Sequence, residues 1–146
     1  MRFSTPLLGL VLLLLVAGVV SVAAEPRLKP VAGFLKIPKG LPLGAASGVD
    51  VDSKGRVYLF HRGPRPILCF GTDGKLVRSW GDDLIGSAHG LRVDRDDNVW
   101  VTDIGHHMVF KFSPKGKLLL ALGQVDKAGT DRDLFDKPTD VAFGPA

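Results

Sequence analysis

Cysteine is nearly absent from this sequence: Cys69 is the only one in 146 residues, so no intrachain disulfide can form. We predict Cys69 to be a small buried residue on a strand. Blocks of basic residues are also missing, because the 19 Lys and Arg and the 15 Asp and Glu are interspersed, and a nucleic-acid partner is therefore not indicated. After Glu25 no segment keeps helical periodicity for ten residues, which argues against a helical repeat array.

The N-terminus has the pattern of an export signal. Arg2 is followed by an apolar run over 7–20 and by the small residues 22–24, which predicts a signal peptide over 1–24 and a secreted or periplasmic protein. The alternative is a membrane anchor formed by residues 6–24, whose length approaches the roughly 20 residues that a membrane span needs.

The rest of the chain is a repeat with a period of 42 residues. Residues 46–81 align with 88–123 without a gap and with eleven identical pairs, and a third copy opens at 138–143. Such a period occurs both in helical arrays and in β-propeller blades, so the local pattern has to decide between them.

Each copy contains four short runs rich in β-branched and aromatic residues, which in the second copy lie at 91–93, 98–102, 108–112 and 118–122. Turn clusters separate these runs, and Gly55, Gly74 and Gly116 stand where tight hairpins need a positive φ. Four antiparallel strands per repeat predict an all-β fold, a β-propeller of four-stranded blades.

The predicted domain boundaries follow from the repeat. We expect a signal peptide over 1–24, an N-terminal linker or strand over 25–43 and a partial propeller over 44–146, with blades at 44–81 and 86–123 and the start of a blade at 137–146. Propellers close with about four to eight blades, and this chain supplies fewer than three, so we expect it to be a fragment.

The strand order brings certain polar residues to one end of the blades. The start of a first strand and the end of the antiparallel second strand open on the same face. The repeat-equivalent residues Ser47, His89 and Thr139 are therefore predicted to form a ring around one mouth of the channel, joined there by His61, Arg62 and Asp103.

Two residues of this mouth are candidate functional groups, each with an ordinary alternative. His89 fits a metal site that takes one ligand from each of several blades, or a hydrogen-bonded structural role. Arg62 fits a clamp for a carboxylate, or a surface ion pair with a neighbouring acid.

Other polar clusters are predicted to be structural. The adjacent His106 and His107 would point to opposite faces of a strand and are interpreted as loop or blade-edge residues. Asp94, Asp96 and Asp97 lack the glycine and the distal glutamate of a calcium-binding loop, so we predict a solvated turn.

The runs at 88–94, 98–103 and 107–112 resemble those of the NHL-repeat propellers. Among these, the chain is most similar to the peptidyl-α-hydroxyglycine α-amidating lyases, which 60–63 and 135–142 also resemble in the same order. The resemblance covers about residues 44–143 and implies six blades in a full-length protein.

The resemblance implies roles for particular residues. His89 would be the first of three zinc ligands, Arg62 the active-site arginine, and the backbone carbonyls of Val49 and Leu91 ligands of a structural calcium. The rest of the site would lie beyond Ala146. The implied reaction cleaves a C-terminal α-hydroxyglycine into a peptide amide and glyoxylate.

Two hypotheses follow. The first is an exported zinc-dependent lyase that acts on a small peptide or another carboxylate-bearing substrate and is incomplete in this chain. The second is a non-catalytic NHL propeller that binds a peptide, glycan or protein partner on the same face. The chain departs from the lyases after Gly63, where Pro64 to Ile67 replace an Asp and a Trp, so the substrate pocket is expected to differ.

Overall fold

The computed structural model describes residues 28–145. The chain divides into two units, Met1–Pro30 and Val31–Ala146, and all the strands belong to the second. The predicted signal peptide, and the membrane anchor that is its alternative, lie outside the described residues. Within the described part of the chain, no helix is both long and apolar enough to cross a membrane.

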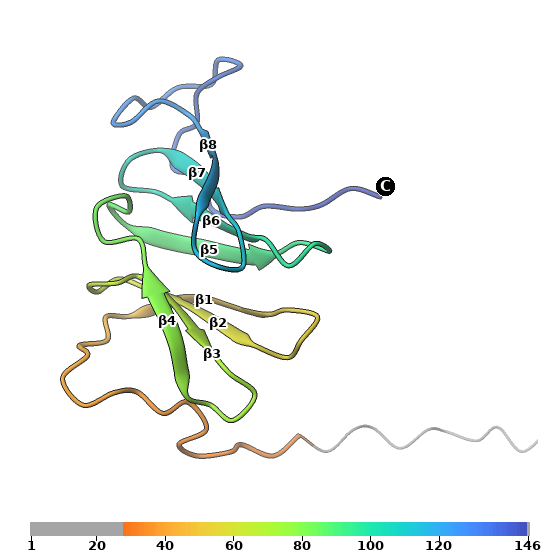
Figure 1. Ribbon diagram of the computed structural model, residues 1–146. Helices are drawn as coiled ribbons and strands as arrows, with labels where there is room; N and C mark the ends of the chain where they lie inside the picture. The colour runs from red at the N-terminus through yellow and green to blue at the C-terminus, as the bar shows by residue number, and fades with distance from the viewer. Residues whose placement is uncertain (1–27, 146) are drawn as a thin grey trace, which may run out of the picture. The chain divides into compact units, whose positions relative to one another are not determined.

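Eight strands form two four-stranded antiparallel sheets, one for each complete copy of the repeat (Figure 1). The first sheet has the order β1-β2-β3-β4 and the second the order β5-β6-β7-β8. Their bounds are β1 Ala46–Val51, β2 Val57–His61, β3 Ile67–Phe70, β4 Leu76–Trp80, β5 Ala88–Val93, β6 Val99–Asp103, β7 Met108–Phe112 and β8 Leu118–Leu122. The all-β, bladed fold predicted from the repeat is confirmed.

Turn chemistry explains where the strands end. Gly55, Gly74 and Gly116 have φ angles of 74°, 76° and 83°, in the left-handed region that glycine reaches at little cost. Asp97 stands at the repeat position of Gly55 and has a φ of 65°. The hairpin between β5 and β6 therefore keeps the geometry of the hairpin between β1 and β2 without a glycine.

A single hydrophobic core joins the two blades. It contains Tyr58, Phe60, Ile67 and Cys69 from the first blade and Leu91, Val99, Val101, Met108, Phe110 and Phe112 from the second. Trp80 lies beside this core, with its ring centroid 6.3 Å from that of Tyr58 and 6.1 Å from that of Phe112. Full burial of each large apolar side chain stabilises the fold by about 1.5–3 kcal/mol. Cys69 is buried on β3, as predicted.

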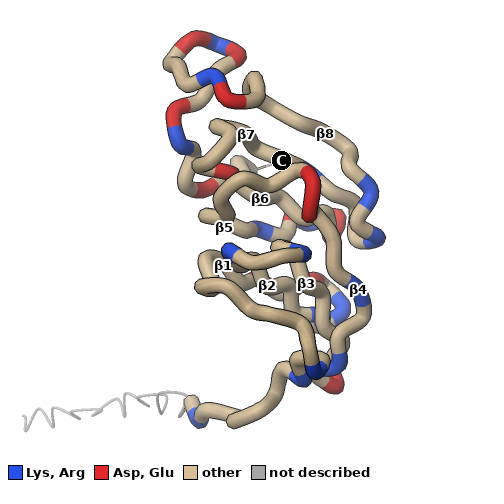
Figure 2. The backbone as a smooth tube through the Cα atoms, turned by 90° about the vertical axis from the view of Figure 1, so that its left-hand side faces the viewer, with Lys and Arg blue, Asp and Glu red and all other residues tan. Residues whose placement is uncertain are grey.

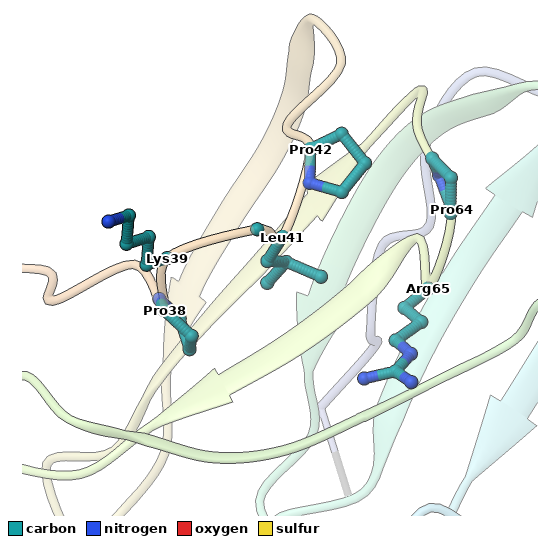
Figure 3. A pocket seen from close by; sticks show the side chains of 7 residues that line it. Pro38, Lys39, Leu41, Pro42, Pro64 and Arg65 are labelled. Carbon is teal, nitrogen blue, oxygen red and sulfur yellow. The ribbon is translucent and has the colours of Figure 1, made fainter.

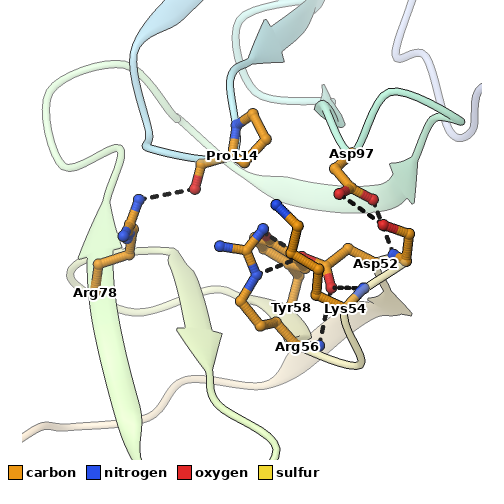
Figure 4. A network of polar contacts seen from close by, with 8 residues as sticks. Asp52, Lys54, Arg56, Tyr58, Arg78, Asp97 and Pro114 are labelled. Carbon is orange, nitrogen blue, oxygen red and sulfur yellow. Dashed lines mark hydrogen bonds and ion pairs between the residues drawn. The ribbon is translucent and has the colours of Figure 1, made fainter.

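A carboxylate holds each hairpin between the first two strands of a blade, and Figure 4 shows the buried one of the first blade, Asp52. The two carboxylate oxygens of Asp52 accept hydrogen bonds from the backbone N–H groups of Lys54 and Arg56, from Arg56 Nε and from the Tyr58 hydroxyl. Burial by itself would raise the pKa of Asp52, but these hydrogen bonds outweigh it and lower the pKa. The hairpin is therefore held by a carboxylate that stays ionised.

Asp94 has the same role in the second blade. It accepts hydrogen bonds from the backbone of Asp96 and Asn98 and from Trp100 Nε1, and Lys111 Nζ lies 3.0 Å from its Oδ2. Burial would raise its pKa, yet these donors lower the pKa to about 2.

The prediction of a solvated turn is therefore wrong for Asp94, and it is wrong for Asp97 as well. Asp97 is buried and accepts the Ser53 N–H at 2.8 Å and the Ser53 hydroxyl at 2.9 Å, which ties the hairpin of the first blade to the second blade. Asp96 alone of the three is exposed. The donors to Asp97 come from a hairpin 44 residues away, which the local pattern could not supply, whereas the donors to Asp94 lie within its own blade.

Residues 137–145, where the third copy begins, form no strand. Instead this segment contacts the second blade through side chains. Arg92 Nη2 lies 2.5 Å from Asp140 Oδ2, and the rings of Trp100 and Phe143 are 5.9 Å apart between centroids. A strand needs a partner for its backbone groups, and no neighbouring segment of the described chain pairs with these residues. That they begin a blade stays a prediction.

Candidate functional site

The inner strands of the two blades, β1 and β5, lie side by side (Figure 2). Along them and the start of the third copy runs a groove of about 210 Å³, lined by Ser47, Gly48, His89, Gly90, Leu91, Arg92, Thr139 and Asp140. The three repeat-equivalent residues Ser47, His89 and Thr139 thus line one groove. Arg62, which was predicted to join them at the same mouth, instead lines a separate hollow with His61 and Ala88.

Glycine allows the inner segments to approach this closely. A Cβ atom on Gly48 would lie 2.8 Å from the Leu91 backbone nitrogen, and a Cβ on Gly90 would lie 2.4 Å from the Thr139 carbonyl oxygen. Real Cβ atoms do not reach such distances, so any other residue would force the segments apart. The two glycines occupy the same position of the repeat and set the spacing of the groove.

The His89 ring is oriented by the backbone of the third copy. Its Nδ1 lies 3.0 Å from the carbonyl oxygen of Thr139. A carbonyl only accepts, so Nδ1 carries the proton and Nε2 is the acceptor nitrogen of the neutral ring. A histidine that binds a metal has this arrangement, with one nitrogen donating to a carbonyl and the other facing the ion.

Arg62 follows β2 and bridges the two blades. Its backbone N–H donates to the Ala45 carbonyl at 3.0 Å, and its side-chain Nε donates to the Ala88 carbonyl at the start of β5 at 3.1 Å. The side chain is exposed, and within residues 28–145 it forms no ion pair. Of the two interpretations of Arg62, the surface ion pair is therefore wrong for the described chain. The guanidinium is held by one nitrogen while two others remain for a ligand.

His61 and Asp103 were predicted to open on the mouth, and this is wrong: both side chains are completely buried. His61 Nδ1 accepts the N–H groups of Gly44 and Gly63, each at 3.1 Å. Burial lowers the pKa of His61 against a smaller opposing effect of the Arg65 backbone, so the ring is neutral near pH 7.

Asp103 holds the repeat-equivalent backbone groups of the second blade. Its Oδ2 accepts the Gly86 N–H at 2.8 Å, and its Oδ1 accepts those of Ser87 and Gly105 at 2.7 and 2.8 Å and that of His106 at 3.3 Å. In each blade the last residue of the second strand thus serves as the acceptor for backbone N–H groups before the first strand and after the second. The role that the structure shows for both residues is to hold the backbone around the first two strands of a blade.

His106 and His107 lie in the loop between β6 and β7, as predicted. His106 Nδ1 is 2.6 Å from Asp126 Oδ1, and this contact raises the pKa of His106. His107 Nδ1 accepts the backbone N–H of Lys137 at 3.1 Å. Both rings hold the segment that follows β8.

Val49 and Leu91 occupy equivalent positions on β1 and β5, opposite Leu59 and Val101. Backbone carbonyls are ligands that calcium accepts, but calcium takes six to eight oxygens. Within residues 28–145 no three His, Cys, Asp or Glu side chains gather closely enough to hold a metal ion. The roles of His89 as a zinc ligand and of Val49 and Leu91 as calcium ligands stay predictions.

One residue of the groove was not anticipated from the sequence. Arg92 stands at the repeat position of Asp50, and the two differ in charge sign. Asp50 accepts the Val93 N–H at 2.8 Å, whereas Arg92 pairs with Asp140. Asp50 and Arg92 thus each link the first strand of their own blade to the next copy of the repeat. In the sequence, the Arg92–Asp140 contact was signalled by the reversal of charge between these two equivalent positions.

Comparison with known proteins relates the chain to amidating enzymes. It is 38% identical over 128 residues to peptidyl-alpha-hydroxyglycine alpha-amidating lyase 1 of Drosophila melanogaster, covering 68% of this chain and 24% of the relative. It is 35% identical over 131 residues to peptidyl-glycine alpha-amidating monooxygenase B of Xenopus laevis, covering 72% and 15%. Human NHL repeat-containing protein 3 is 34% identical over 110 residues, covering 67% and 31%. No protein-family model matches the chain.

Among solved structures, virginiamycin B lyase from Staphylococcus aureus superposes with a TM-score of 0.54 at 21% identity, covering 69% of this chain and 32% of that protein. This similarity supports the propeller fold. The chain spans no more than about a third of each of these proteins. The predicted resemblance to the NHL-type amidating lyases is confirmed.

Proposed function

From its relationship to the amidating lyases, we propose that the chain is part of an exported, zinc-dependent lyase that converts a peptide ending in α-hydroxyglycine into a peptide amide and glyoxylate. The observation that carries this proposal is the orientation of His89, whose Nδ1 faces the Thr139 carbonyl while its ring lines the groove. A structural histidine could make the same contact, but the sequence relationship favours the metal ligand.

His89 Nε2 would be one zinc ligand, and the other ligands would come from outside the described residues. Zinc when bound would act as a Lewis acid on the substrate oxygens. The carbonyls of Val49 and Leu91 would contribute to a calcium site that holds β1 and β5 together.

Arg62 would bind the substrate carboxylate. Its Nε is engaged by the Ala88 carbonyl, so the guanidinium plane is fixed before substrate arrives. Two remaining nitrogens can then donate to both oxygens of a carboxylate, which is the strongest geometry for this pair. The same fixed positive charge would stabilise negative charge that develops on the reacting oxygens.

The reaction balances without an oxidant or a reductant. A base removes the proton of the α-hydroxyl group, the bond between the α-carbon and the amide nitrogen breaks, and the nitrogen takes up a proton. The α-carbon becomes the aldehyde of glyoxylate, and the peptide leaves as its amide. The substrate is a small peptide bearing a carboxylate, and export of the protein by residues 1–24 would place the reaction in a secreted or periplasmic compartment.

The test is release of glyoxylate from an α-hydroxyglycine peptide by the full-length protein. We expect His89→Ala to abolish it, a chelator to abolish it, and added zinc to restore it. His106→Ala is the matched control, because His106 contacts Asp126 away from the groove and should leave the rate unchanged. Full activity in His89→Ala would refute the zinc role.

A folded protein that releases no glyoxylate yet binds peptides would instead support the non-catalytic propeller.

A further inference from the structure

A second hollow, of about 420 Å³, lies between the linker that precedes β1 and the loop that joins β2 to β3 (Figure 3). It is lined by Pro38, Lys39, Gly40, Leu41, Pro42, Pro64 and Arg65. None of these residues lines the groove of His89. The loop is nevertheless the one that carries Arg62, three residues before Arg65.

The two walls of this hollow are fixed to each other. Both are hydrogen-bonded to the same buried ring, since His61 Nδ1 accepts the N–H of Gly44 from the linker and that of Gly63 from the loop. A Cβ on Gly44 would lie 2.4 Å from the Arg62 carbonyl carbon, so the linker passes in direct contact with the loop. Prolines at 38, 42 and 64 restrict φ on both walls. The hollow is therefore preformed, and a ligand would not have to order it.

Its chemistry is apolar with a positive rim. Leu41 and the prolines provide the apolar lining, and Lys39 and Arg65 are exposed. Within residues 28–145 neither cation forms an ion pair, and no acidic residue lines the hollow. Asp82 approaches the loop, but it accepts the backbone N–H of Arg65. A ligand with a short apolar stem and a negative end matches this surface.

We propose that this hollow is a subsite for an acidic side chain of the peptide substrate, two or three residues before the reacting α-hydroxyglycine. This inference rests on the proposed lyase function for the identity of the substrate. The Cα atoms of Arg62 and Arg65 are at most about 11 Å apart, and an extended peptide advances about 3.3 Å per residue. A peptide whose terminal carboxylate is on Arg62 is therefore long enough to reach this hollow with a side chain two or three residues upstream.

The activity test uses α-hydroxyglycine peptides that differ only at this upstream position, with Glu, Gln or Lys. We expect kcat/KM to be about tenfold higher for Glu than for Lys, which corresponds to about 1.4 kcal/mol. Arg65→Gln combined with Lys39→Gln should reduce the preference to about twofold through KM, with kcat unchanged. Lys54→Gln, in the hairpin between β1 and β2, is the matched loss of one exposed cation and should keep the preference.

A binding test separates this inference from the lyase proposal. Fluorescence anisotropy with labelled peptides that end in plain glycine reports affinity without turnover. One outcome is that no glyoxylate is released, that the Glu peptide binds more tightly than the Lys peptide, and that the double variant loses this difference. It would support the subsite and refute the lyase proposal. If glyoxylate is released with equal kcat/KM for Glu and Lys, the lyase stands and the subsite is wrong. A preference that survives in the double variant also overturns the subsite.

Discussion

The buried carboxylate of Asp103 offers a direct test of how the mouth is built, through the substitution Asp103→Asn. The two carboxylate oxygens accept four backbone N–H groups, three on Oδ1 and the Gly86 N–H on Oδ2. Asparagine keeps the size of the side chain but has only one acceptor oxygen. If the amide oxygen of the asparagine faces the three donors, its NH₂ group faces the Gly86 N–H. Both of these groups are donors, so the Gly86 N–H loses its acceptor.

The cost follows from the hydrogen bonds that the substitution removes. A hydrogen bond to a charged group contributes about 1.5–3 kcal/mol, and a buried donor left without an acceptor carries a further penalty of similar size. The side chain of Asp103 is completely buried, so the new amide group cannot turn out to solvent and stays against the Gly86 N–H. We expect the free energy of unfolding to fall by about 2–3 kcal/mol.

The assay is urea denaturation followed by tryptophan fluorescence, with the slope of the transition compared between variants. Asp96→Asn is the matched control, because Asp96 is an exposed turn residue of the same blade and its loss should change the free energy by less than about 0.5 kcal/mol. Equal effects of the two substitutions would refute the argument that the buried acceptor holds the mouth.

Three further predictions address the hairpin, the groove and the core. The pKa of Asp94 is about 2 in the folded protein and about 3.9 in the unfolded chain. Its ionised form should therefore contribute about 2 kcal/mol to the free energy of unfolding above about pH 5, and this contribution should be lost as the pH falls from 4 towards 2. Urea midpoints against pH should show this slope, and Asp94→Asn should flatten it. Gly90→Ala should lower the melting temperature at a cost of about 2 kcal/mol, because its Cβ meets the Thr139 carbonyl, whereas Gly144→Ala, with open space around it, should not. Burial raises the pKa of the Cys69 thiol, so a thiol reagent should react with it far more slowly in the native chain than in urea, and equal rates would contradict its burial.

Much of the fold could be predicted from the repeat. The runs at 108–112 and 118–122 match β7 and β8 residue for residue, and the turn glycines have the positive φ angles expected of them. The first strand of the second copy was predicted too short, because β5 begins at Ala88 and contains a bulge that interrupts the alternation between Ala88 and Leu91. The grouping of Ser47, His89 and Thr139 in one groove agrees with their equivalent places in the repeat, whereas the strand-order argument wrongly added His61 and Asp103.

The sequence by itself determined the period, the strands and the equivalence of His89 with Ser47 and Thr139, since each of these depends on local pattern and on copy number. Only the tertiary structure decided what the polar groups do. The buried side chains of His61 and Asp103 accept hydrogen bonds from backbone N–H groups. Asp97 accepts hydrogen bonds from Ser53, 44 residues away, and the His89 ring is oriented by the Thr139 carbonyl, 50 residues away. The physical reason is that a buried polar group must find its partner wherever the packed chain brings one, and that partner leaves no mark in the neighbouring sequence.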